Sequence, residues 1–133
     1  MLSRERRLKT TDFEKAFANS KQFRHPFLVL RCYCRAEEEA QNGLRAAFVV
    51  PKKLAKATGR NRWRRRLRHW FYEILDSAPE REQNNGAQCN RCDFIFMLTA
   101  QGRDATSREV HQAMSMLWKK ALRSLGHNES SSA

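Results

Sequence analysis

The stretch Arg60–Leu75, RNRWRRRLRHWFYEIL, decides the fold because it describes a strongly two-sided helix. At about 100° per residue its apolar side chains gather on one side, which we expect to face the core. These apolar residues are Trp63, Leu67, Trp70, Phe71 and Ile74. The opposite side carries Asn61, Arg62, Arg65, Arg66, His69 and Tyr72. We predict a helix over about residues 60–77, ending before Pro79.

The polar side of this helix is cationic. Six of the nine residues from Arg60 to Arg68 are arginine, and no acidic residue occurs between Glu39 and Glu73. A helix surface that merely faces water usually carries acids three or four residues from its bases, because such pairs stabilise it. Guanidinium groups also pair with phosphate oxygens through two hydrogen bonds. The stretch is therefore predicted to bind a polyanion.

The chain as a whole shares this charge. Its 133 residues include 26 Lys and Arg against 14 Asp and Glu, a formal net charge of +12. Nucleic acid is the favoured partner and an anionic membrane the second. No apolar run approaches the roughly 20 residues that span a bilayer, and the first residues lack an apolar signal stretch. We expect a cytoplasmic protein with no membrane partner.

A single domain is predicted over residues 1–133. Within it we expect a basic arm at 1–9, a mobile loop at 80–91 and a frayed tail at 126–133. Two further helices should begin with capping boxes, in which Thr11 pairs with Glu14 and Thr106 with Glu109. The apolar stripe of the second is Val110, Ala113, Met114, Leu117, Trp118 and Ala121.

Three strands are predicted around these helices. Phe27–Arg35 alternates in direction, so that Leu28, Leu30, Cys32 and Cys34 point one way and Phe27, Val29, Arg31 and Tyr33 the other. An acidic turn at 36–43 would join it to a second strand, Leu44–Val50, as a hairpin. Asp93–Thr99 contains an unbroken apolar run, which is typical of a strand covered on both faces.

RNA is favoured over DNA as the polyanion. No helix-turn-helix partner immediately precedes the arginine helix, and the Cys/His spacing of zinc fingers is absent. Aromatic side chains near a basic surface can stack on the exposed bases of irregular RNA. Phe13 and Phe17, beside the strand face of Val29 and Arg31, are candidates for this role. The alternative is that both phenylalanines belong to the ordinary core.

The four cysteines form two close pairs, Cys32 with Cys34 and Cys89 with Cys92. We expect reduced thiols, which pack as small apolar groups. A C-x-C and a C-x-x-C could also supply four zinc ligands. A zinc-stabilised nucleic-acid binder therefore stays open as an alternative.

Nothing in the chain predicts catalysis by the polypeptide. The acids form no recognisable metal-binding motif, and His25, His69, His111 and His127 are scattered along the sequence. The chain has no phosphate-binding glycine loop and no nucleophile elbow. We assign no catalytic residue and no protein-bound metal.

One spacing resembles a known family. Lys52-Lys53, six intervening residues and Arg60-Asn61-Arg62, followed by further arginines, resemble the "RNR" signature of the bacterial ribonuclease P protein component. Weaker matches, such as Arg7-Leu8-Lys9 and Leu117-Trp118-Lys119-Lys120, extend the resemblance from about residue 4 to 125. The chain departs from the family at Ala55-Lys56-Ala57-Thr58, where a Gly-Asn-Ala-Val-like run is common, and at Arg31, where an aromatic is usual.

The resemblance implies an α+β fold, an α-β-β-β-α-β-α two-layer sandwich with a left-handed βαβ crossover, related to ribosomal-protein domains. A fourth, short strand is then expected. It implies a protein subunit of ribonuclease P, an endoribonuclease in which catalytic RNA removes the 5′ leader of precursor tRNA. The Mg²⁺ would be bound mainly by that RNA, with one protein per RNA. The alternative function is a plain RNA-binding or ribosome-associated protein, which needs no leader site.

The resemblance also implies roles for particular residues. Contacts to the catalytic RNA are expected from Arg60, Asn61, Arg62, Arg65, Arg66, Arg68, Lys52 and Lys53. A cleft for the leader is expected at Phe13, Phe17, Val29 and Arg31, with Lys52 or Lys53 at its edge.

Overall fold

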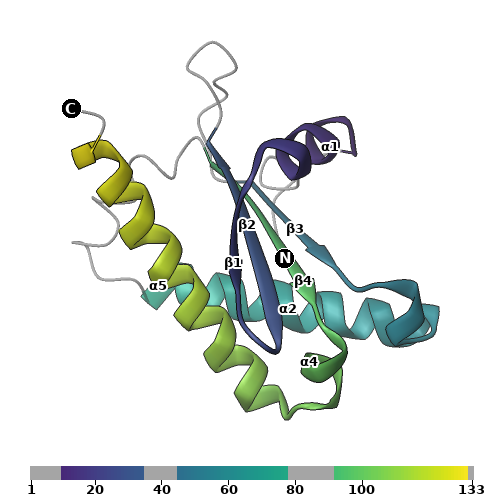
Figure 1. The fold of residues 1–133 in the computed structure, drawn as a ribbon. Coiled ribbons are helices and arrows are strands. Elements are labelled where there is room, and N and C mark those ends of the chain that lie inside the picture. Colours follow the sequence, from purple (N-terminus) through teal and green to yellow (C-terminus); the bar gives the residue numbers. More distant parts are fainter. Residues whose placement is uncertain (1–9, 35–44, 78–91, 132–133) are drawn as a thin grey trace.

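The computed structural model describes residues 10–34, 45–77 and 92–131, and the predicted arm at 1–9 and loop at 80–91 lie outside them. Its elements, in chain order, are α1 (Thr10–Asn19), β1 (Lys21–Arg24), β2 (Leu28–Cys34), β3 (Arg45–Val49), the 3-10 turn η3 (Lys52–Leu54), α2 (Ala57–Ser77), β4 (Cys92–Leu98), the short helix α4 (Ala100–Asp104) and α5 (Ser107–Ser131). The expected α-β-β-β-α-β-α order is present (Figure 1), and β1 is the short additional strand.

The four strands form one sheet in the order β1-β2-β4-β3. Strand β4 is antiparallel to β2 and parallel to β3. The predicted hairpin of the strands at 27–35 and 44–50, which are β2 and β3 in the structure, is therefore wrong, because β4 lies between them. Residues 92–96 of β4 are all buried, so the most apolar strand takes a central position, where both of its faces are covered. The handedness of the β3–α2–β4 crossover stays a prediction.

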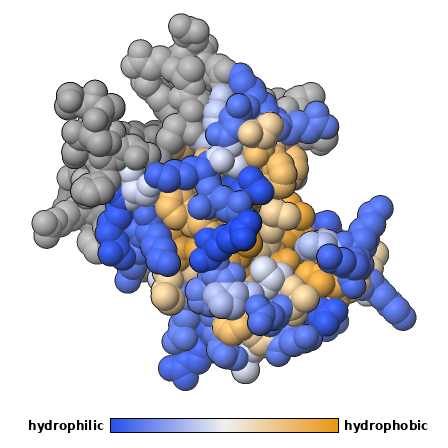
Figure 2. Space-filling view, viewed as in Figure 1, coloured by the Kyte–Doolittle hydropathy of each residue, from blue (hydrophilic) through white to orange (hydrophobic). Residues whose placement is uncertain are grey.

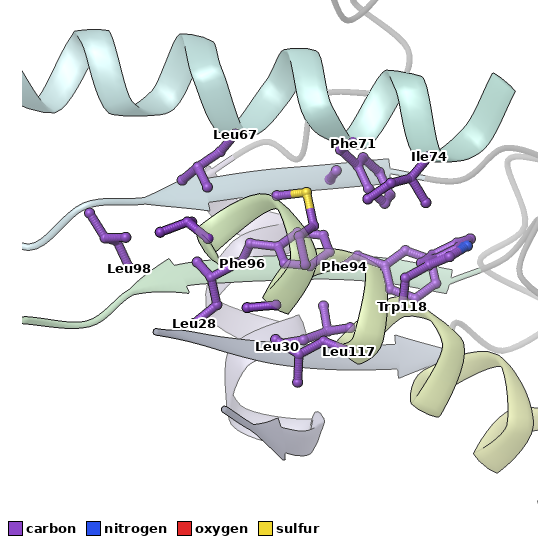
Figure 3. Packing of buried hydrophobic residues seen from close by; sticks show 14 of the residues in the cluster. Leu28, Leu30, Leu67, Phe71, Ile74, Phe94, Phe96, Leu98, Leu117 and Trp118 are labelled. Atoms are coloured by element: carbon purple, nitrogen blue, oxygen red, sulfur yellow. The ribbon is translucent and has the colours of Figure 1, made fainter. Parts of the chain in front are cut away.

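The main core lies between one face of the sheet and helices α2 and α5. Figure 3 shows Leu67, Phe71 and Ile74 pointing from α2 toward the sheet, where Phe94 and Phe96 of β4 meet them. Helix α5 contributes Trp118, whose ring centroid lies 4.9 Å from that of Phe94 and 5.3 Å from that of Phe71. The apolar stripes predicted on both helices are confirmed as core, except that Trp70 is half-buried and packs against the edge of the core.

Helix α1 packs on the other face of the sheet. Ala16 of α1 and Ile95 of β4 are fully buried but lie outside the main core cluster. Arg31 of β2 pairs with Ile95 and contacts Phe17 of α1. Among the described residues, this second face is covered by one short helix, and much of it is only half-buried.

The helix ends differ slightly from those predicted. Helix α1 begins at Thr10, so Thr11 lies inside it, and the side chains of residues 10–12 lie outside the described ones. Helix α2 begins at Ala57, three residues before Arg60, and α5 continues through Ser131, so most of the predicted tail at 126–133 has helical backbone. The capping box at Thr106 is confirmed, since the Glu109 N–H donates to the Thr106 hydroxyl at 3.2 Å.

Candidate nucleic-acid interface

Helix α2 presents its arginines as the sequence predicts. Asn61, Arg62, Arg65 and Arg66 are exposed, and the border residues Arg60, Arg64 and Arg68 are half-buried. We call these seven residues the arginine face. One correction concerns Tyr72, predicted on the polar side, which is half-buried and packs against the core. Helix α2 packs against both the sheet and α5, so its buried side is wider than the apolar stripe alone and includes Tyr72.

The arginine face has no acidic counter-charge in residues 10–34, 45–77 and 92–131. The carboxylate of Glu73 on α2 contacts histidines, with its oxygens 2.9 Å from His69 Nε2 and 3.8 Å from His111 Nε2. The arginines contact neutral groups instead. Arg64 Nη1 donates to Asn61 Oδ1 at 3.2 Å, and the Arg66 guanidinium lies 5.4 Å from the Trp63 ring centroid. These contacts orient the guanidinium groups and leave their charge uncompensated.

Lys52 and Lys53 lie at the start of this face. Both are exposed on η3, which packs against α2, while Leu54 points into the core with 7% of its surface exposed. Arg103 of α4 donates from Nη1 to the Leu54 carbonyl oxygen at 3.2 Å. The turn that carries the two lysines is thus held in place by the burial of Leu54 and by the hydrogen bond from Arg103.

Phe13, Phe17 and Arg31 come together on the second face of the sheet. The two phenylalanine ring centroids are 5.8 Å apart, and the Arg31 guanidinium lies 4.0 Å from the Phe17 centroid. Arg31 Nη1 also donates to Ser20 Oγ at 3.3 Å. Val29 lies two residues before Arg31 on the same side of β2 and is half-buried. We call Phe13, Phe17, Val29 and Arg31 the α1–sheet surface.

This surface is neither core nor fully open. Phe13 and Phe17 are half-buried and lie outside the main core cluster, which argues against the ordinary-core interpretation. Strand pairing places Met97 of β4 and the exposed Arg24 of β1 beside Val29. Figure 2 shows apolar side chains between hydrophilic ones below α1. Such a surface can hold a ligand with flat apolar groups and negative charge, as a single nucleic-acid strand has.

The sequence did not predict the places of Arg24, Met97 and Arg103. Arg24 and Met97 join the α1–sheet surface only through the register of β1 and β4 with β2. Arg103 acts through a backbone carbonyl 49 residues earlier in the chain. No sequence motif marks such contacts, so no local signal could have identified them.

Of the acids and cysteines considered as metal ligands, Asp93 is hydrogen-bonded to an arginine, and Cys32 and Cys92 lie in the core. Asp93 is 1% exposed and accepts hydrogen bonds from Arg45 Nε and Nη2, each at 2.8 Å. Cys32 and Cys92 are buried in the main core cluster. Cys89 and the side chain of Cys34 lie outside the described residues. Within the described part, no three His, Cys, Asp or Glu side chains are placed to hold a metal ion.

Asp104 and Glu109 have pKa values below their usual range. A hydrogen bond and charge attraction from Arg103 lower the pKa of Asp104. Hydrogen bonds from the Thr106 N–H and hydroxyl lower the pKa of Glu109. Both carboxylates serve local structure at the two ends of the connection between α4 and α5.

Among the described helices, none is long and apolar enough to cross a membrane.

Comparisons with known proteins agree with this geometry. The family model for ribonuclease P matches residues 2–122. The ribonuclease P protein component of Herpetosiphon aurantiacus is 28% identical over 121 residues, which cover 90% of this chain and 87% of that protein. That of Listeria welshimeri is 35% identical over 75 residues, covering 56% of this chain and 60% of that protein.

Solved structures share the fold. The Staphylococcus aureus RNase P protein matches with a TM-score of 0.68 and 21% identity, covering 87% of this chain and 94% of that one. The RNase P protein from Thermotoga maritima matches with a TM-score of 0.64 and 20% identity, covering 84% and 94%. This chain therefore belongs to the ribonuclease P protein family, whose members act with an RNA subunit in tRNA processing.

Proposed function

We propose that the arginine face binds the backbone of the catalytic RNA, while the α1–sheet surface binds the 5′ leader of precursor tRNA. The observation that carries this proposal is the row of guanidinium groups on α2 with no carboxylate partner in the described residues. Neighbouring like charges on a helix destabilise it. RNA phosphates would remove that repulsion and accept paired hydrogen bonds from each guanidinium.

The α1–sheet surface supports the leader as its ligand. The Arg31 guanidinium lies over the face of Phe17, so a strand bound at this surface would meet a cation and an aromatic ring together. A phosphate can pair with Arg31, and a base can stack on the guanidinium plane or on Phe13. In this chain phosphate contact would thus take over part of the role of an aromatic side chain.

Catalysis is proposed to reside in the RNA. The described residues offer no group of side chains suited to hold Mg²⁺, so we propose that the ion is bound mainly by the RNA. There it would supply an activated water. The protein would neutralise phosphates and hold the leader, with one protein per RNA, in the cytoplasm.

Reconstitution tests this function. The full chain is added to a bacterial ribonuclease P RNA at low Mg²⁺, and cleavage of precursor tRNA is followed with time. We expect the protein to restore cleavage, because its positive charge replaces part of the Mg²⁺ that screens the RNA. Cleavage at the same rate with and without protein would contradict the proposal.

A second measurement separates the two candidate functions. Affinity is compared for precursor tRNA with and without its 5′ leader, each in the presence of catalytic RNA. A subunit that holds the leader should bind the leader-bearing RNA more tightly, and Arg31→Ala should reduce that difference. Equal affinities would favour a plain RNA-binding or ribosome-associated protein.

A further inference from the structure

We propose that the second half of α5 and the neighbouring strand β1 form a second contact for RNA backbone, engaged by a segment of the catalytic RNA other than the one on α2. This inference rests on the proposed function. The surface consists of Lys21 from β1 and Lys119, Lys120 and Arg123 from α5, all exposed. We call it the α5–β1 surface.

The fold brings these four cations together from distant parts of the sequence. Lys21 Nζ donates to the hydroxyl of Ser124, which joins β1 to α5 across 103 residues. Lys120 lies one helical turn before Ser124 on the same side of α5, and is therefore next to Lys21. Arg123 lies one turn after Lys119. The three α5 cations occupy little more than one turn, about 6 Å along the helix axis.

The α5–β1 surface lacks compensating acids in the same way as the arginine face. No acidic residue occurs between Glu109 and Glu129, and no carboxylate of the described residues is within ion-pair distance of the four cations. Lys119 and Arg123 are like charges four residues apart, an arrangement that destabilises a helix. A helix surface that only faces water would carry acids at these spacings. The arrangement fits a bound polyanion.

Met116 adds an apolar element to this surface. It is 51% exposed, and it lies three and four residues before Lys119 and Lys120, on the same side of the helix. An exposed methionine beside cations suits a ligand that offers phosphates together with sugar or base surfaces. Single-stranded or irregular RNA has both.

This surface is separate from the arginine face. In Figure 1 the second half of α5 lies at the upper left, whereas the first half of α2 lies at the right, beyond the sheet. In Figure 2 hydrophilic side chains, with apolar ones between them, lie over the area where the middle of α5 is seen in Figure 1. The protein would therefore hold two RNA segments at separate places on its surface.

The test compares the salt dependence of binding to a bacterial ribonuclease P RNA for variants of the full chain. In one variant Lys119, Lys120 and Arg123 are all replaced by Gln. Its plot of log K against log salt has a negative slope, which should become less steep by about two to three units, since each lost phosphate contact removes about 0.7–0.9. Exchanging the same residues within the basic class (Lys119→Arg, Lys120→Arg, Arg123→Lys) should restore the slope, and Arg108→Gln, an exposed base outside the surface, should leave it unchanged.

The outcomes distinguish this inference from the proposed function. A normal slope for the triple variant, together with a reduced slope for Arg65→Gln on α2, overturns the second contact and leaves the proposed function standing. A normal slope for Arg65→Gln with a reduced slope for the triple variant supports the second contact and contradicts the role of α2.

Acetylation of lysines in the unmodified protein provides a readout that needs no variant. The probe is the same catalytic RNA, and mass spectrometry compares modification rates with and without it. Bound RNA should slow modification of Lys21, Lys119 and Lys120 as well as of Lys52 and Lys53. Protection of Lys52 and Lys53 alone would overturn the second contact.

Discussion

Replacing Asp93 with Asn should strongly destabilise the protein, because it leaves the Arg45 guanidinium without its buried counter-charge. Two guanidinium nitrogens of Arg45 lie 2.8 Å from the two carboxylate oxygens, and the Asp93 side chain is 0% exposed. Removing one partner of a buried ion pair typically costs ~3–5 kcal/mol. The Arg45 side chain is 14% exposed, so water screens it slightly, and we expect a loss of about 3 kcal/mol.

Urea unfolding at pH 7 measures this loss. With a denaturant dependence of ~1–3 kcal/mol per molar urea, the midpoint should fall by at least about 1 M. The matched control is Asp104→Asn, which breaks the exposed pair with Arg103 and should change the midpoint little. A double variant, Arg45→Met with Asp93→Leu, removes both charges and should recover part of the stability. Equal midpoints for Asp93→Asn and Asp104→Asn would refute the reasoning.

Loss of this ion pair should also affect RNA binding. It joins β3 to β4, and β3 leads through η3 into α2. A loosened β3 should therefore weaken binding of the catalytic RNA.

Four further predictions concern single positions. Phe17→Ala should lower affinity for leader-bearing precursor tRNA by about 1–3 kcal/mol and leave leaderless tRNA unaffected, as competition binding can show. Thr106→Ala should cost about 1 kcal/mol of stability through the lost cap. The lowered pKa of Glu109 contributes stability that is complete above the usual carboxyl pKa and lost as the pH falls through the lowered value. Glu109→Gln should abolish that acid-range dependence in thermal unfolding. In Gly102→Ala the new Cβ would clash with the backbone carbonyl oxygen of Phe27, which should cost about 3 kcal/mol of stability. Gly59→Ala, whose new Cβ would have its nearest contact at 3.2 Å from the Ala55 side chain, should be tolerated. Equal melting temperatures for the two variants would contradict this.

The sequence was sufficient to predict the two sides of α2 except at Tyr72, which packs against the core. Helical periodicity is local, and large apolar residues such as Leu67 and Phe71 leave few alternatives for the buried side. The arginines at the border between the two sides, such as Arg64, are half-buried. The resemblance to a family added the element order and the short strand β1, which is too brief and too polar for a periodicity argument.

Strand pairing was beyond the reach of local patterns. An acidic turn between two apolar strands resembles a hairpin, but β3 pairs with β4, which follows it by more than forty residues. The gain from placing the most apolar strand in the centre of the sheet appears only when all four strands are considered together. For the same reason the sequence could not place Arg24 beside Val29.

The candidate site was predicted residue by residue, but not its contacts. Phe17 and Arg31 were named separately, and the structure places the Arg31 guanidinium over the Phe17 ring. That contact depends on the angle at which α1 crosses β2. The roles of these residues toward RNA stay predictions.

The salt dependence of binding to catalytic RNA is the most direct measurement of the central claim, that the uncompensated guanidinium groups of α2 hold RNA phosphates. The decisive variant replaces Arg62, Arg65 and Arg66 with Gln, a good helix former that keeps the length of the side chain but not its charge. The account predicts that the negative slope of log K against log salt is less steep, by about two to three units, than that of the unmodified protein. An unchanged slope in a fully folded variant would contradict it.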